Sequence, residues 1–175
     1  MRALALALSL GLAGCASLPP PQEPLALAIA GRLAVRVDPV EPGAAVRSSS
    51  GSFELLGTPS VGELRLSSPL GTVHAVARWR PGDVTLLADG QGRHYANLDE
   101  LTREMVGEVL PVEALFDWLR GRPWNGAPSG PLPEGAAGFT QLGWNVSLAQ
   151  VGEGLILATR PTPPAVTVRA KIDPS

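Results

Sequence analysis

The sequence predicts an α+β domain in which a curved antiparallel sheet carries a short pair of helices across one face. Apolar and polar residues alternate over most of the chain, and helical spacing replaces this alternation only in the middle. The strand segments are short and joined by turns, whereas parallel strands would need long crossover connections. The order of strands, two helices, a loop and further strands therefore favours helices packed against an antiparallel sheet.

The composition narrows the function classes. The 175 residues include 14 Lys and Arg against 16 Asp and Glu, a net charge of −2. This balance shows no basic footprint for nucleic acid, and none is expected as a partner. Gly (20) and Pro (18) are frequent, but 45% of residues are hydrophobic, which indicates a folded, loop-rich domain. One Cys and two His exclude a disulfide framework and a zinc site made only of Cys and His.

The N-terminus has the features of a secretory signal. Arg2 precedes an apolar run over residues 3–13 that is too short to span a bilayer. The run ends in Leu-Ala-Gly-Cys at Cys15, which resembles the bacterial lipobox, where the thiol is diacylated, the chain is cut before it and the new amine is acylated. We therefore expect residues 1–14 to be a lipoprotein signal peptide and Cys15 to carry covalent lipid. The alternative is a chance Cys in an ordinary signal peptide.

The residues after the cysteine indicate a tether and a destination. Ala16 and Ser17 follow Cys15, and the absence of Asp there favours sorting to the outer membrane. Residues 15–24 are Pro-rich and predict a semi-extended tether, so residues 25–175 are expected to form a single domain. Three acyl chains at ~0.8 kcal/mol per buried CH₂ would make the anchor effectively permanent.

Period-two alternation locates the strands. An Asp89-Gly90 pair is a strong hairpin signal between two of them. In the last third of the chain, Leu142, Trp144, Val146 and Leu148 alternate with small or polar residues. The pattern predicts strands at 32–37, 63–66, 72–79, 84–88, 91–96, 142–148, 155–159 and 166–172.

Helical spacing replaces alternation between residues 97 and 120. Asn97 is placed as an N-cap, with the acidic Glu100 three residues later. Leu98, Leu101, Met105 and Val109 then form one apolar stripe. Pro111 restarts the chain, a second helix is expected over 112–120, and the Gly/Pro-rich residues 121–138 are expected to form a long loop.

No segment matches a catalytic motif. The chain has no phosphate loop, no nucleophile elbow and no His-Glu-x-x-His, so we expect neither a catalytic residue nor a metal or cofactor site. His74 and His94 are interpreted as surface histidines, and Asp99 and Glu100 as helix-capping residues. An envelope hydrolase with a site assembled from distant residues is one alternative that stays open.

Two features could carry function without reactive groups. The apolar faces of strands and helices could close into a plain core, which periodicity alone favours, or could line a cavity under a helical lid. In the turn Ser68–Gly71, Pro and Gly suit a type I geometry that places Leu70 at the tip. A single exposed leucine is common and usually carries no meaning.

Five segments in order resemble the LolB family, the outer-membrane receptors of the bacterial lipoprotein localisation pathway. The resemblance implies a partly open antiparallel barrel with a helical lid over an apolar cavity. The segments are Gly31–Val35, Gly51–Phe53, Leu64–Gly71, Leu115–Gly121 and Phe139–Trp144.

The resemblance implies roles for particular residues. In LolB-like proteins the Leu of the Pro-Leu-Gly turn protrudes and is needed to pass lipoproteins into the membrane. This role carries over to Leu70, with Pro69 and Gly71 shaping the turn. Candidate acyl-chain cavity and lid residues are Phe53, Leu64, Leu66, Trp79, Leu101, Met105, Leu115, Phe116, Trp118 and Trp144.

The implied function is non-enzymatic lipoprotein transfer by a monomer that faces the periplasm from the outer membrane. Its partners would be a LolA-like periplasmic carrier, acylated lipoprotein cargo and outer-membrane lipid. Without a nucleotide site, transfer would run downhill in affinity from carrier to receptor. Two further alternatives stay open: a structural or assembly envelope lipoprotein with a closed core and protein partners only, and a soluble periplasmic carrier of similar fold.

Overall fold

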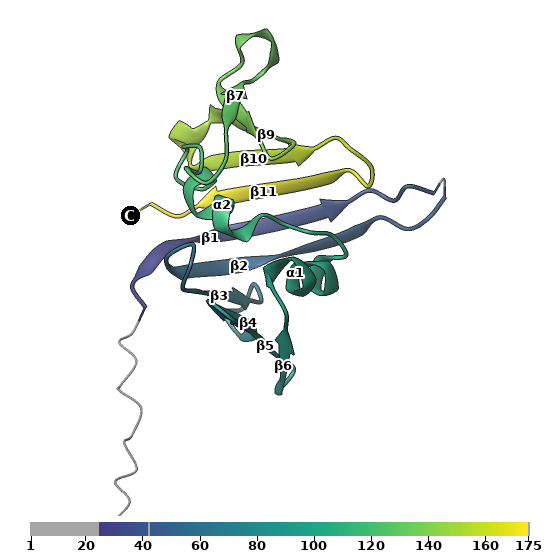
Figure 1. The fold of residues 1–175 in the computed structure, drawn as a ribbon, viewed down its shortest axis with the longest axis vertical. Coiled ribbons are helices and arrows are strands. Elements are labelled where there is room, and N and C mark those ends of the chain that lie inside the picture. The colour runs from purple at the N-terminus through teal and green to yellow at the C-terminus, as the bar shows by residue number, and fades with distance from the viewer. Residues whose placement is uncertain (1–24, 42, 175) are drawn as a thin grey trace, which may run out of the picture.

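The computed structural model describes residues 25–41 and 43–174. The expected signal peptide, Cys15 and the tether lie outside these residues. Within them, eleven strands form one antiparallel sheet in the order β6-β5-β4-β3-β2-β1-β11-β10-β9-β8-β7 (Figure 1). The edge strands β6 and β7 do not pair with each other, so the sheet is an incomplete barrel. The predicted α+β class is confirmed.

The strands follow the alternating segments. Each predicted strand has a counterpart, with boundaries that differ mostly by one or two residues; β1 alone begins five residues earlier than predicted. In chain order they are β1 (Leu27–Val37), β2 (Arg47–Gly57), β3 (Gly62–Ser67), β4 (Val73–Arg80), β5 (Asp83–Ala88), β6 (Gln91–Tyr95), β7 (Ser129–Pro131), β8 (Gly138–Gln141), β9 (Trp144–Gln150), β10 (Leu155–Arg160) and β11 (Val166–Ile172).

Two parts of the sheet differ from the alternation pattern. β2 was not predicted as a strand, because four serines between residues 48 and 52 hide any apolar face. The predicted strand 142–148 is wrong at its start, because Leu142 and Gly143 have φ values of 53° and 77° and form the turn between β8 and β9. The predicted loop 121–138 also contains β7 and a short 3-10 helix, η1 (Pro133–Gly135). A second one, η2, spans Val151–Glu153.

The first helix, α1 (Leu98–Val106), begins as predicted. The side chain of Asn97 accepts a hydrogen bond from the backbone N–H of Glu100 at 2.9 Å, and the Glu100 carboxylate accepts one from the N–H of Ala96 at 2.8 Å. The helix ends before Val109, because Gly107 adopts φ 88° and its N–H closes the last turn on the carbonyl of Arg103.

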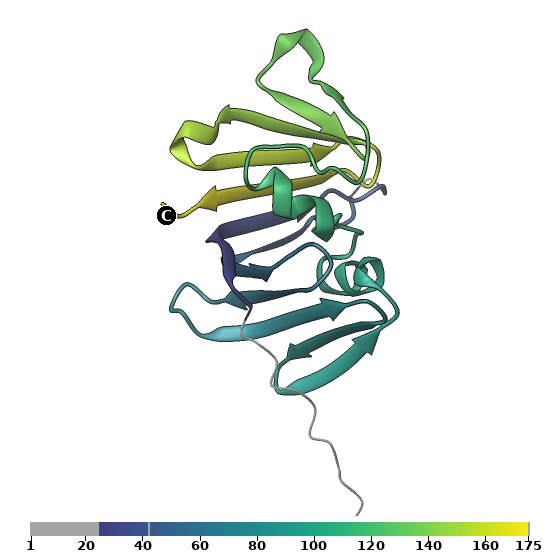
Figure 2. The ribbon, with the colours of Figure 1, turned by 60° about the vertical axis from the view of Figure 1, so that its left-hand side comes forward.

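The second helix, α2 (Val112–Trp118), separates two hydrophobic cores. Val112 and Phe116 point into the core formed with β2–β5, whereas Ala114 and Trp118 point into the core formed with β8–β11. This division follows from helical periodicity, since residues four apart share a face. Both helices lie against the same face of the sheet (Figure 2). None of the helices among the described residues is long and apolar enough to cross a membrane.

Candidate functional site

An apolar cavity of about 90 Å³ lies between the N-terminal half of the sheet and the two helices. The sheet contributes its wall, and α1, the linker 107–111 and α2 contribute its cover. The lining is almost wholly aliphatic or aromatic, which is the character of a site for an apolar ligand. It comprises Leu33, Val35, Ser49, Ser50, Gly51, Phe53, Leu55, Leu64, Leu66, His74, Ala77, Trp79, Leu98, Leu101, Thr102, Met105, Val106, Leu110, Val112, Leu115 and Leu119.

The cavity exists because small side chains on β4 do not fill the space under the helices. Strand pairing aligns Leu64 on β3 with Ala77 on β4 and Leu86 on β5, so an alanine stands between two leucines. Further along β4, Trp79 closes the space: its indole N–H donates to the carbonyl of Pro59 at 2.9 Å, and its ring meets the edge of Phe116 at 5.9 Å.

Polar contacts hold the cover of the cavity in place. The hydroxyl of Thr102 on α1 accepts a hydrogen bond from the backbone N–H of Leu110 at 3.1 Å, which fixes the linker to the helix. The guanidinium of Arg160 on β10 donates to the carboxylate of Glu108 in the linker at 2.7 Å and lies 5.7 Å from the ring centre of Trp144. The linker is therefore tied to the C-terminal half of the sheet by one partly exposed ion pair.

One end of the cavity is more polar than the rest. Ser49, Ser50 and Gly51 of β2 and His74 of β4 line it there, and the serines and His74 are exposed. Alternation places His74 on the polar surface of a strand, and in the structure His74 lies at the cavity's margin. An exposed polar margin on an apolar interior gives a ligand one side from which to enter.

The turn between β3 and β4 presents Leu70 to solvent. The N–H of Gly71 donates to the carbonyl of Ser68 at 2.9 Å, and the N–H of Ser68 to that of Thr72 at 2.9 Å. Gly71 has φ 84°, a left-handed conformation that favours glycine. The side chain of Leu70 is 94% exposed, the highest value among the exposed large hydrophobic side chains of the described residues.

Seven of the ten predicted cavity residues line the cavity. Phe116, Trp118 and Trp144 do not. Phe116 is fully buried behind the lining, in contact with Trp79, and the other two belong to the core of the C-terminal half. The sequence could not separate Phe116 from Trp118, because both faces of α2 are apolar, and alternation on β9 does not show which half of the sheet Trp144 packs with. The seven residues in the lining are Phe53, Leu64, Leu66, Trp79, Leu101, Met105 and Leu115.

The C-terminal core is closed by a buried polar group, Gln141 on β8. Its side-chain oxygen accepts from the indole N–H of Trp118 at 2.7 Å and from the backbone N–H of Trp124 at 2.9 Å. Its amide donates to the carbonyls of Trp124 and Ala127, both at 2.7 Å. All four hydrogen-bonding capacities of this amide are therefore used, and the loop after α2 is fastened to the sheet.

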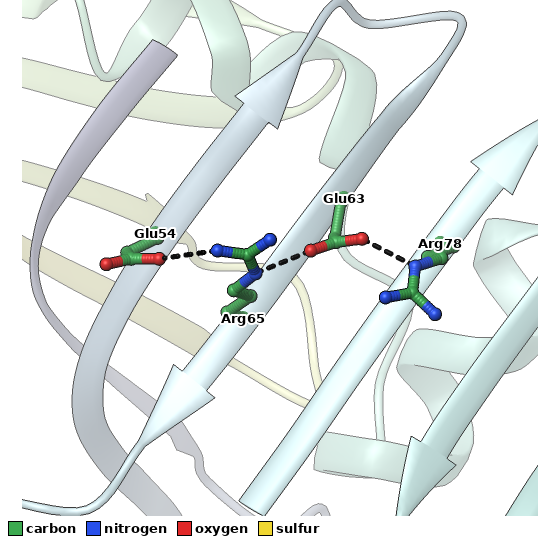
Figure 3. Close-up of polar contacts among 4 residues, drawn as sticks. All are labelled: Glu54, Glu63, Arg65 and Arg78. Atoms are coloured by element: carbon green, nitrogen blue, oxygen red, sulfur yellow. Dashed lines mark hydrogen bonds and ion pairs between the residues drawn. The ribbon is translucent and has the colours of Figure 1, made fainter. Parts of the chain in front are cut away.

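A row of alternating charges crosses the outer face of the N-terminal half (Figure 3). Glu63 is 6% exposed and accepts from Nε of Arg65 and of Arg78, both at 2.5 Å, while Arg65 also reaches Glu54 at 3.3 Å. Burial opposes ionisation of Glu63, but the two guanidinium groups outweigh it and lower its pKa below the ordinary value. The row joins β2, β3 and β4 on the face opposite the cavity.

Several lining residues were not predicted, among them Leu33, Val35 and Leu98. Their alternation and helical stripe marked them as apolar and inward-facing, but neither pattern tells a cavity wall from a packed core. Among the described residues, no group of three His, Cys, Asp or Glu side chains is arranged to hold a metal ion.

Comparisons with known proteins agree over most of the chain. The model of a family described as "Outer membrane lipoprotein LolB" matches residues 26–171. Proteins named "Outer-membrane lipoprotein LolB" are similar to it: that of Bordetella petrii is 35% identical, covering 91% of this chain and 85% of its own length. That of Chromobacterium violaceum is 34% identical, covering 83% and 80%, and that of Neisseria meningitidis is 33% identical, covering 77% and 70%.

Proposed function

This chain belongs to the LolB family, outer-membrane lipoproteins of the lipoprotein localisation pathway, and on that premise we propose a transfer function. It accepts acylated lipoproteins from a LolA-like periplasmic carrier into its apolar cavity and inserts them into the outer membrane. The covalent lipid on Cys15 holds it there, facing the periplasm. The observation that carries the proposal is the apolar cavity under the two helices.

The size of the cavity requires that it open for its ligand. Its volume of about 90 Å³ is below the roughly 150 Å³ of an engineered protein cavity that holds one benzene. An acyl chain is much larger than benzene, so α1 and the linker must move away from the sheet. Among the described residues, two ion pairs restrain this cover: Glu104 of α1 with Arg93 of β6, and Glu108 of the linker with Arg160 of β10. Opening exposes apolar walls, and an acyl chain covers them again.

Transfer needs no energy source beyond relative affinity. A receptor that binds acyl chains more tightly than the carrier does draws cargo from it, and the membrane must in turn bind them more tightly than the receptor. Enclosure by a movable lid limits the receptor's affinity, since part of the binding free energy is spent on opening it. The free energy of the bound acyl chains then falls at each step, from carrier to receptor and from receptor to membrane.

Leu70 acts at the last step. Burying its side chain in the leaflet contributes ~1.5–3 kcal/mol, which is too little to anchor the protein but enough to orient the turn or loosen lipid packing. Its near-complete exposure at a rigid turn leaves it free to enter a membrane without unfolding any contact.

Two measurements test the proposal. A fluorescent fatty acid should bind the wild-type chain and lose at least tenfold in affinity for Ala77→Leu, which fills the cavity, but not for Ala149→Leu on the exposed part of β9. No uptake by any variant would favour the closed-core assembly lipoprotein instead.

The second measurement is delivery of acylated cargo into vesicles. Leu70→Glu should abolish delivery while carrier-to-receptor transfer continues, and Leu142→Glu, in the exposed turn between β8 and β9, should deliver normally. Normal delivery by Leu70→Glu would refute the insertion role.

A further inference from the structure

A basic groove lies on the face of the sheet opposite the helices, beside the Leu70 turn. Its volume is about 330 Å³. This basic groove is lined by Arg32, Ala34, Ser50, Ser52, Pro69, Arg169 and Lys171, together with Leu33 and Gly51.

Strand register explains the shape of the groove. Ser52, Arg32 and Lys171 stand in one row across β2, β1 and β11, and Ser50, Ala34 and Arg169 stand in the next. These residues alternate along their strands with the inward-facing core residues, so they face outward. The serines and alanine have short side chains and form a floor, whereas Arg169 and Lys171 rise on one side and Pro69 on the other.

The groove carries uncompensated positive charge. Among the described residues, neither Arg32 nor Arg169 has a carboxylate within 4.0 Å, and the ammonium of Lys171 donates to a backbone carbonyl, that of Glu153. No acidic side chain lines the hollow. The whole chain has a net charge of −2, so three cations around one hollow make this part of the surface locally positive.

The neighbouring turn indicates which anion the groove meets. Pro69 forms its wall, and the next residue, Leu70, projects an apolar side chain into solvent. A surface that is apolar at its tip and basic in the hollow beside it matches a membrane, where acyl chains lie beneath phosphates. Guanidinium groups hold phosphate oxygens through paired hydrogen bonds.

We propose that the basic groove binds the headgroup phosphate of an anionic membrane phospholipid, whose charge no choline cation offsets, when Leu70 enters the leaflet. The inference rests on the proposed function, because it needs the Leu70 turn at the membrane. Binding of a headgroup would hold the turn at a defined depth and orientation, which a single leucine cannot do. The attraction also adds a long-range component that decays within a Debye length.

The test is vesicle flotation with the chain from Ala16 onward, which keeps both hydrophobic cores and lacks the acyl anchor. Vesicles of phosphatidylcholine alone are compared with vesicles that also contain phosphatidylglycerol, at low and high salt. Arg32→Gln/Arg169→Gln is the test variant. Arg80→Gln/Arg122→Gln is the matched control, since it removes the same charge from exposed arginines paired with Asp83 and Asp117.

The wild type and the control should prefer the phosphatidylglycerol vesicles, and this preference should weaken with salt. The test variant should lose affinity for them by about 30-fold, from roughly fivefold per cation, and keep its weak binding to phosphatidylcholine. Leu70→Glu should lose binding to both vesicles. If Leu70→Glu binds normally, the proposed membrane role of the turn fails.

Two results would overturn the inference about the groove alone. One is vesicle binding by the test variant equal to that of the control. The other is a loss by the test variant, in solution, of cargo transfer from the carrier, which would make the groove a protein-docking surface. Tight binding of inorganic phosphate to the wild type in the absence of vesicles would instead indicate a site for the free anion.

Discussion

The N-terminal part of the sheet, β2–β6, and the C-terminal part, β7–β11, flank the central strand β1 in one continuous sheet. Their side chains pack differently: one core is filled and the other encloses a cavity. In the C-terminal half, paired strands align Val35, Val168, Ala158, Val146 and Phe139 in one row across five strands. Trp118 of α2 packs onto this half and makes edge or tilted contacts with Phe139 and Trp144 at 6.4 and 5.9 Å. This half is a closed core.

In the N-terminal half the corresponding space is left partly empty. Alanine at position 77 and the curvature of β3–β5 leave room that the aliphatic side chains of α1 do not fill. The polar bonds are also distributed differently: the closed half has Gln141 inside its core, and the hollow half has the Glu63 charge row on its outer face. The cavity in the N-terminal half can therefore stay unfilled, because the closed core of the C-terminal half supplies the close packing that stabilises the fold.

Removing the buried hydrogen bonds of Gln141 should lower the free energy of unfolding more than any other change. Gln141→Leu leaves the indole N–H of Trp118 and three backbone groups without partners, which should lower the free energy of unfolding by about 3–5 kcal/mol. Urea denaturation measures it. Gln150→Leu on exposed β9 is the matched control and should change stability by less than about 0.5 kcal/mol. A loss below about 1 kcal/mol for Gln141→Leu would show that these hydrogen bonds are dispensable.

Truncating one large aliphatic side chain in each half compares the packing directly. Ile156→Ala, in the closed core, should cost about 3–4 kcal/mol, because its neighbours cannot collapse into the space. Leu64→Ala, on the cavity wall, should cost about 1–2 kcal/mol, because that side chain already faces a void, and should increase uptake of the fatty-acid probe. Equal costs in urea denaturation would contradict the division into closed and hollow halves.

The outer charge row should stabilise the hollow half in a pH-dependent way. Because the pKa of folded Glu63 lies below its ordinary value of 4.5, its ionised form adds stability above about pH 4.5, and this is lost as the pH falls through the folded pKa. Glu63→Gln should cost about 1–3 kcal/mol at pH 7. The difference from wild type should shrink in urea titrations below pH 4.5.

The matched control is Glu54→Gln, whose exposed carboxylate makes one long contact with Arg65 and should contribute less than about 1 kcal/mol. A difference between wild type and Glu63→Gln that is constant from pH 7 to pH 3 would show that the row does not depend on ionised Glu63.

The smallest effect on stability is expected at the join between the halves. Glu108→Gln weakens the pair with Arg160 and should cost less than about 1 kcal/mol in unfolding. Because the pair restrains the cover of the cavity, the fatty-acid probe should associate several-fold faster, as stopped-flow fluorescence would show. Glu113→Gln on the exposed side of α2 should leave the rate unchanged, and the same rate for both variants would show that the pair does not restrain the cover.

Much of the fold could be predicted from local patterns. Alternation located the strands other than β2, β7 and β8, and the Asn97 cap located the start of α1. β2 was missed because its serines carry no apolar signal, and its place is set by pairing with β1 and β3. The predicted strand start at Leu142 was wrong, because Leu142 fits the apolar alternation of the sequence although its backbone forms a left-handed turn.

The residues of the candidate site, too, could be predicted only in part. The exposed tip at Leu70 could be predicted, because the turn geometry resides in three adjacent residues. Seven of the ten residues predicted for the cavity, all apolar and inward-facing, are in its lining, but Trp118 and Trp144 have the same pattern and belong to the closed core.

The sequence by itself determined the inward faces of most strands, the start of α1 and the exposure of Leu70, because these depend on residues a few positions apart. The tertiary structure alone decided which buried residues enclose space and which fill it. That outcome depends on the volumes of side chains from strands and helices distant in the sequence, such as Ala77 under α1 and Gln141 against Trp118. The same holds for the basic groove, whose cations come from two strands that meet only in the folded sheet.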